Sequence, residues 1–222
     1  MAMPDSSHTT PPVSETGSAP DVTVPDLWHA RDVDPHVGGP HFGRLAGAMQ
    51  ELQDRFTGAC LPSELVEQVT AQLESLTSTF AAHQVDETHA PAGARNDLPG
   101  RGSVLFPRFR IDETGETSSS GHVMFTRFHL GGNGAAHGGT LALLFDDIMG
   151  HLISTRGLGV FRTAYLTVNF RKVALIDRPL RFDVTIDRIE GRKGWLSARV
   201  HDGDVVVSDA EGLFIRLLPG QP

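Results

Sequence analysis

Cysteine is nearly absent from this sequence: Cys60 is the only one among 222 residues. A single thiol excludes an internal disulfide framework and suits a reducing compartment. Long apolar runs are missing too, because the longest one, residues 141–153, contains two aspartates and a histidine, so we expect no membrane span. No apolar leader precedes Arg31, the first basic residue, so we expect no secretory signal and a cytoplasmic protein.

Basic residues are scarce in the first half of the chain. Residues 1–100 contain four arginines, no lysine and 14 acidic residues, whereas residues 162–199 contain nine basic and four acidic residues. The net charge of −8 argues against a general nucleic-acid binder. A local basic zone on an acidic protein suits a small anionic ligand better, so we expect no nucleic-acid partner.

The first 40 residues have few large apolar side chains and contain seven of the 14 prolines. This composition predicts a disordered tail over residues 1–40. Apolar residues then recur at helical spacing in two stripes, which predict a helical hairpin over residues 41–83 that must bury its apolar stripes on something. A linker rich in turn residues follows, so residues 41–100 are expected to be a helical hairpin and linker.

From residue 103 the period of the apolar pattern changes to two. Strands are predicted at 103–112 and 121–130, then at 161–171, 180–190, 194–203 and 204–218. Between the two groups, a helix of residues 138–155 is apolar nearly all round, which is typical of a buried helix. The sequence therefore predicts an α+β domain over residues 101–222, with a mostly antiparallel sheet wrapped around one long helix.

The stretch "GGNGAAHGGTLALLFDD" places two acids inside this buried helix. The glycines allow tight turning, and the first helical N–H groups can stabilise an anion, either a phosphate or the oxyanion of a tetrahedral intermediate. Burial would raise the pKa of Asp146 and sharpen it as a base or nucleophile. Asp147 lies about 100° further round the helix, so one of the two acids is expected to be structural, and the sequence does not choose between them. A dinucleotide-binding loop is disfavoured because His137 replaces the third glycine and no βαβ alternation surrounds the stretch.

"HGGTLALLFDD" followed by "TAYLTVNFRK" resembles the hotdog-fold acyl-CoA thioesterases, in the branch of the phenylacetate-pathway enzymes. The shared pattern is His-Gly-Gly, an aspartate nine residues after the histidine, and a strand that opens with Thr-Ala. The resemblance covers about residues 103–218 and implies a hotdog fold, with an N-terminal helical extension in this chain. It departs from the family at Val173, where a proline commonly follows the basic run.

The resemblance implies a role for each matching residue. Asp146 would be the nucleophile or general base, the amide of Gly139 would hold the oxyanion, His137 would shape the turn and Thr163 would position the water or Asp146. The remaining residues implied in substrate binding are Gly138, Asn133, Arg171, Lys172, Arg192 and Lys193, with the four basic ones near the phosphates of coenzyme A. It also implies a site between two subunits, hence a homodimer or a dimer of dimers. No cofactor is expected apart from the coenzyme A of the substrate.

Two other kinds of chemistry are disfavoured by spacing. The 11 histidines show no paired ligand spacing, so no metal site is expected. Asp146 and His151 are five residues apart, which is similar to the Asp/His spacing of hotdog enoyl-CoA hydratases, but here both lie on a helix behind the glycines. Two hypotheses therefore lead: an enzyme that hydrolyses an acyl-CoA thioester, and a non-catalytic hotdog module that binds or senses acyl-CoA.

Overall fold

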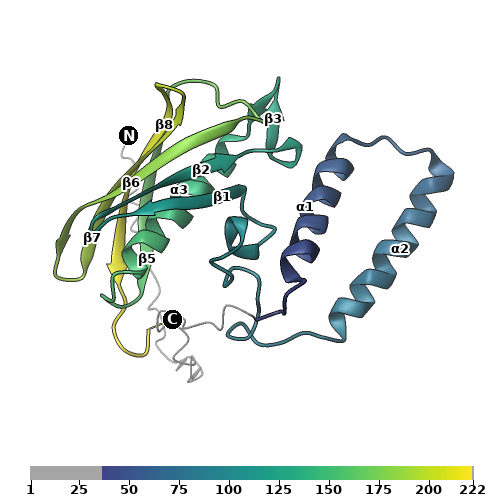
Figure 1. Ribbon diagram of the computed structural model, residues 1–222, viewed down its shortest axis with the longest axis horizontal. Coiled ribbons are helices and arrows are strands. Elements are labelled where there is room, and N and C mark those ends of the chain that lie inside the picture. The colour runs from purple at the N-terminus through teal and green to yellow at the C-terminus, as the bar shows by residue number, and fades with distance from the viewer. Residues whose placement is uncertain (1–36, 222) are drawn as a thin grey trace, which may run out of the picture.

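The computed structural model describes residues 37–221, and the tail predicted over residues 1–40 lies almost wholly outside this range. Two α-helices come first, α1 (Phe42–Gly58) and α2 (Ser63–Ala81), followed by the 3-10 turn η1 (Pro99–Gly102). The predicted helical hairpin is confirmed. Figure 1 shows the two helices standing to one side of the sheet, with α1 nearer to it and α2 outermost.

The rest of the chain forms a six-stranded antiparallel sheet around one helix. The elements in chain order are β1 (Arg108–Thr114), β2 (Ser118–Met124), the 3-10 turn η2 (Arg127–His129), β3 (Leu130–Gly132), β4 (Ala135–Ala136), α3 (Gly138–Ser154), β5 (Phe161–Phe170), β6 (Pro179–Glu190), β7 (Lys193–Asp202) and β8 (Val205–Arg216). The strand order is β1-β2-β6-β7-β8-β5, so β1 and β5 are the two edges of the sheet. The predicted α+β hotdog arrangement is confirmed.

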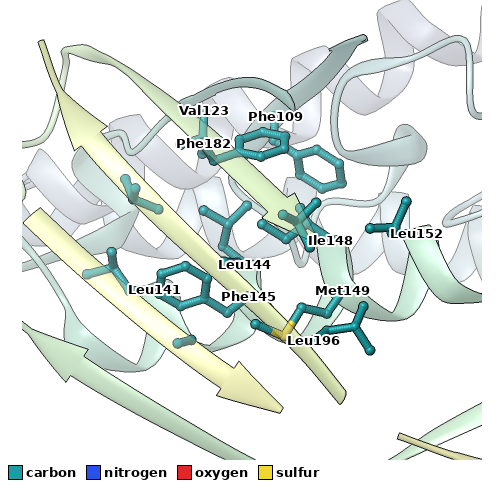
Figure 2. Close-up of a cluster of buried hydrophobic side chains, with 14 of the residues drawn as sticks. Phe109, Val123, Leu141, Leu144, Phe145, Ile148, Met149, Leu152, Phe182 and Leu196 are labelled. Carbon is teal, nitrogen blue, oxygen red and sulfur yellow. The ribbon is translucent and has the colours of Figure 1, made fainter. Parts of the chain in front are cut away.

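The core lies between the sheet and α3. The apolar stripe predicted on the helix is buried, and it meets the alternating side chains of the strands, as Figure 2 shows for Leu144, Phe145 and Ile148 against Phe182 and its neighbours. Burying a side chain of this size stabilises the fold by about 1.5–3 kcal/mol. This packing holds α3 against the sheet and thereby sets the positions of the polar side chains on the helix.

The predictions for the first two strands were wrong in their bounds. Strands expected at 103–112 and 121–130 are found at residues 108–114 and 118–124. The first starts late because Pro107 has no N–H to donate and because the chain turns through positive φ at Gly100 and Arg101. The second starts early because residues 118–120 pair with β6, so backbone hydrogen bonds support a run of serines that the pattern assigned to a turn. The predicted helix and the four later strands agree with α3 and β5–β8 to within a few residues.

Within residues 37–221, hydrogen bonds tie α1 to the sheet domain. Gln53 of α1 donates from Nε2 to the carbonyl of Val104 at 3.2 Å, and Asp54 accepts from the N–H of Phe128 at 3.0 Å. α2 has no buried residue and does not pack closely against α1. The hairpin was expected to bury its apolar stripes, and within this chain it does not do so.

Candidate active site at the helix α3

The start of α3 is set by a tight turn and a histidine. Asn133 and Gly134 both have positive φ, 50° and 76°, which is the backbone of a two-residue hairpin turn between β3 and β4. The chain then reaches His137, the N-cap of α3, whose Nδ1 accepts a hydrogen bond from the N–H of Gly139 at 3.0 Å. The imidazole of His137 therefore caps the helix at this turn. In doing so it accepts a hydrogen bond from the Gly139 amide, which was predicted to hold an oxyanion.

Gly138 lies where the helix start meets the end of β5. A Cβ on Gly138 would lie 3.0 Å from the ring of Phe170, so a larger residue would require this exposed ring to shift by a few tenths of an ångström. Its N–H is the first of the helix and has no intrahelical acceptor, by the geometry of any α-helix. This amide is directed outward at the positive end of the helix dipole, which favours a negative charge there.

Asp146 lies two turns further along α3 and faces β5. Thr163 of β5 donates from Oγ1 to Oδ1 of Asp146 at 2.6 Å, which links the helix to the edge strand. Asp146 is half-buried, and Thr163 is exposed at the sheet edge. The bulge between Thr163 and Tyr165 keeps Thr163 on the helix side while the rest of β5 continues its alternation. The predicted pairing of Thr163 with Asp146 is thus present, at a surface rather than in a closed pocket.

Asp147 is the structural acid of the pair. Both of its carboxylate oxygens accept from the guanidinium of Arg101, at 2.7 and 2.8 Å, and only 9% of its side chain is exposed. Burial raises the pKa of Asp147 to about 6, and the charge of Arg101 opposes that rise without cancelling it. The sequence left open which of the two acids is structural, and the ion pair with Arg101 assigns that part to Asp147.

Arg101 is the residue that sequence reasoning missed. It comes from η1, in the segment predicted to be a linker, and it has φ of 56°, which a non-glycine residue rarely adopts. The only signal in the sequence was a lone arginine between two glycines in "PGRGS". Which helical acid it would reach depended on the path of the linker, which no local pattern indicates.

His151 lies with Arg101 and not with Asp146. Burial lowers the pKa of His151 to about 4, and the charges of Arg101 and Arg156 lower it further, so its imidazole is neutral at pH 7. It lines a cavity of about 340 Å³ together with Arg101, Phe109 and Arg110. The Asp/His pair considered for a hydratase is therefore not brought together, because the two side chains lie on different sides of α3.

The four basic residues proposed for coenzyme A fall into two separate groups. Arg171 follows β5 and donates from Nε to Asp209, and this contact raises the pKa of Arg171 and lowers that of Asp209. Arg192 lies in the β6–β7 turn and donates from Nε to the carbonyl of Arg216 at 2.8 Å, beside Lys193. Since Arg216 pairs with Phe161 at the other end of β5, Arg171 and Lys172 are separated from Arg192 and Lys193 by the length of that strand, about 30 Å. One coenzyme A phosphate cannot contact both groups within a single chain.

Asp146 and Thr163 line neither the cavity beside His151 nor a small cavity between α1 and η2. Among residues 37–221, no cluster of three His, Cys, Asp or Glu side chains has the geometry of a metal site. Within this same part of the chain, no helix is both long enough and apolar enough to cross a membrane.

Comparison with known proteins finds a family similarity within the sheet domain. The model of the thioesterase superfamily matches residues 133–208, which run from the turn before α3 to β8. Residues 133–208 are therefore similar to the thioesterase superfamily, and they make up about a third of this chain. The matched range includes Gly139, Asp146 and Thr163.

Two relatives resemble part of this chain in sequence, and one solved structure resembles it in fold. The chain is similar to human acyl-coenzyme A thioesterase THEM5, with 33% identity over 86 residues, and to bovine THEM4, with 36% identity over 88 residues. These matches cover 38% and 39% of this chain and 34% and 35% of the relatives, so the similar part spans about a third of their length. A solved structure of a thioesterase superfamily protein has the same fold, with a TM-score of 0.68 and 22% identity, and covers 78% of this chain and 94% of that one. That share exceeds the hotdog domain, so the likeness extends into the N-terminal helical part.

Proposed function

We propose that this chain hydrolyses the thioester bond of an acyl-CoA, releasing a free acid and coenzyme A. The observation that carries the proposal is the hydrogen bond from Thr163 to Asp146, within a domain of the thioesterase superfamily. This bond restrains the half-buried carboxylate of Asp146 through its Oδ1 atom. A carboxylate fixed in this way suits a base or a nucleophile, because its orientation is set before the substrate binds.

Two mechanisms are compatible with this arrangement. Asp146 could accept a proton from water while the water oxygen attacks the thioester carbon, after which the C–S bond breaks and the thiolate leaves with a proton. Alternatively the carboxylate could attack the carbonyl itself, expel the thiolate and form a mixed anhydride that water then opens. A single turnover in ¹⁸O-labelled water tests the second route: if water opens the anhydride at Cγ of Asp146, ¹⁸O enters the peptide that contains Asp146, and the first route never places it there.

The oxyanion donors for this reaction are proposed to come from a second copy of the chain. Asp146 and the Gly139 amide of the same helix lie about 10 Å apart along its axis, at about 1.5 Å per residue, which is too far for one thioester to touch both. Within the described residues 37–221, β5 is an edge strand with one side of its backbone unpaired, and it presents Thr163, Tyr165 and Phe170 at the surface. A second copy placed along this edge would bring its Gly138 and Gly139 amides opposite Asp146. The same arrangement would allow Arg171 and Lys172 of one copy, and Arg192 and Lys193 of the other, to serve one substrate.

Asp146→Asn is the direct test of this function. We expect the variant to keep its fold and to lose hydrolysis of every acyl-CoA in a panel of chain lengths, read as free thiol released. The loss should be about 100-fold or more, the size of effect typical of a positioned acid or base. Asp187→Asn, on the exposed part of β6, is the matched control and should leave the rate unchanged. Undiminished thiol release by Asp146→Asn would contradict the mechanism.

A second candidate is an acyl-CoA binding module without hydrolysis. One observation favours it: the Gly139 amide already donates to His137, so an incoming oxyanion must displace the imidazole before it gains that donor. Equilibrium binding of a non-hydrolysable acyl-CoA thioether, measured beside thiol release from the matching thioester, decides between the two. Tight binding of the ether with no thiol released from the ester favours the binding module.

A further inference from the structure

The helical hairpin displays an apolar surface that the rest of the described chain leaves uncovered. We call it the hairpin stripe, and its exposed members are Leu45, Leu52, Phe56, Leu65, Val66, Leu73, Leu76 and Phe80. Phe56 is 76% exposed and Leu76 is 51% exposed, and none of the 19 residues of α2 is buried. An isolated amphipathic helix of this length is marginal in water, so the apolar face of α2 needs a partner.

We infer that the hairpin stripe is the docking surface for the hairpin of a second copy of this chain. α1 and α2 each carry one stripe, yet the two helices do not pack closely against each other, which Figure 1 shows as two separated rods. Two such hairpins can exchange helices about a two-fold axis, so that α2 of one copy covers α1 of the other. The result is a four-helix arrangement in which each copy presents the same surface to its partner, as isologous contacts require.

The size of the surface is adequate for a stable contact. α2 has 19 residues, so it is about 28 Å long, and two helices side by side present a face of roughly 28 by 20 Å. This projected area of about 560 Å² understates the accessible area, because side chains stand out from it. It is of the same order as the ~800 Å² that each partner buries in a typical specific interface.

Charge favours a second copy over an anionic membrane surface. α2 carries Glu64, Glu67 and Glu74 and no basic residue, whereas helices that lie on membranes usually carry lysine and arginine on the polar face. α1 carries Arg44 and Arg55 beside Glu51 and Asp54 and is neutral overall, so an acidic α2 that covers the α1 of another copy meets less like charge than it would against a second α2. The likeness to a solved thioesterase superfamily structure also extends into this helical part, which indicates that the hairpin belongs to the fold.

If the Asp146 site is formed by two copies of the chain, the hairpins of these copies belong to one assembly. This argument is the only one here that rests on the proposed function. The hairpin contact lies outside the Asp146 site, since α1 packs on η1 and η2 rather than on β5. The two contacts can therefore be tested separately in one sample.

The single cysteine provides a specific probe. Cys60 is exposed in the turn between α1 and α2, so a spin label there reports only distances between copies. We expect pulsed dipolar spectroscopy of the full chain to give a narrow inter-copy distance. The double variant Leu73→Glu/Leu76→Glu should lose that narrow distance, because it places charge in the centre of the stripe. The matched control Ala71→Glu/Ser78→Glu adds the same two charges at exposed positions on the opposite face of α2 and should retain it.

Two results would overturn the inference: no dipolar interaction in the unmodified chain, or an unchanged distance distribution in Leu73→Glu/Leu76→Glu. Slow amide exchange in α2 without any inter-copy distance would also overturn the inference, because the residues that shield α2 from solvent would then belong to the same chain. Thiol release from acyl-CoA is measured in the same samples. A narrow Cys60 distance without hydrolysis would reject the catalytic proposal and leave the hairpin contact standing.

Discussion

The buried ion pair between Arg101 and Asp147 allows a quantitative prediction. Arg101→Met removes the guanidinium but keeps most of the apolar length, so Asp147 stays buried without its partner. Breaking a buried pair from one side typically costs about 3–5 kcal/mol, because the remaining charge is left uncompensated. Arg101 is 20% exposed and Asp147 9%, so solvent compensates little of this loss. We expect the free energy of unfolding at pH 8 to fall by about 3 kcal/mol.

The sign of the pH dependence follows from the pKa of Asp147. Its pKa in the fold is about 6, above the ordinary value of 3.8, so the stability tied to this group is fully present below pH 3.8 and is lost as pH rises through 6. In Arg101→Met, burial still raises the pKa of Asp147, but the positive charge that opposed this rise is gone. The pKa of Asp147 in the folded variant is therefore higher than in the unmodified chain. Each unit of difference is worth about 1.4 kcal/mol. The gap between Arg101→Met and the unmodified chain should therefore narrow as the pH is lowered from 8 to 5.

Urea unfolding followed by tryptophan fluorescence and far-UV circular dichroism at pH 5, 6.5 and 8 measures this gap. The double variant Arg101→Met/Asp147→Asn should lose the part of the pH dependence that belongs to Asp147, because its carboxyl no longer titrates; the part that remains belongs to His151, whose pKa Arg101 also lowers. Arg55→Met breaks an exposed pair with Glu51 and should cost at most about 0.5 kcal/mol. A gap that stays constant from pH 5 to pH 8, or the absence of any gap at pH 8, would refute the reasoning.

Two further predictions concern the site and the sheet. Thr163→Val should keep the thermal midpoint within a few degrees and lower kcat for acyl-CoA more than it changes KM, because only the restraint on Asp146 is lost; an unchanged kcat would show that the Thr163 bond has no part in catalysis. Gly121→Ala should lower the free energy of unfolding by about 3 kcal/mol, since the new Cβ would lie 2.1 Å from the carbonyl oxygen of Arg110 on the neighbouring strand. Gly47→Ala, in a helix with open space around it, is the control and should be neutral or stabilising by up to about 1 kcal/mol; equal losses in the two glycine variants would contradict the close approach of β1 and β2.

The sequence by itself determined the elements whose signals are local. The helical stripe from Leu141 to Leu152 and the strict alternation in β6 and β7 predicted α3 and the later strands almost to the residue, because burial on one face leaves a periodic pattern. The His-Gly-Gly motif and the spacing to Asp146 likewise predicted where the candidate site lies on the helix. The bounds of β1 and β2 escaped prediction, because the serines of β2 are held by backbone hydrogen bonds to β6, a partner more than 50 residues away.

Only the tertiary structure decided which acid has which partner. Asp146 and Asp147 are neighbours of one type, and their difference arises because the packing of α3 turns one towards Thr163 of β5 and the other towards Arg101 of η1. It also decided that the four basic residues form two groups at opposite ends of β5, and that the hairpin stripe remains uncovered within the described part of one chain. Each of these outcomes depends on contacts between segments distant in sequence, which a residue pattern read along the chain does not contain.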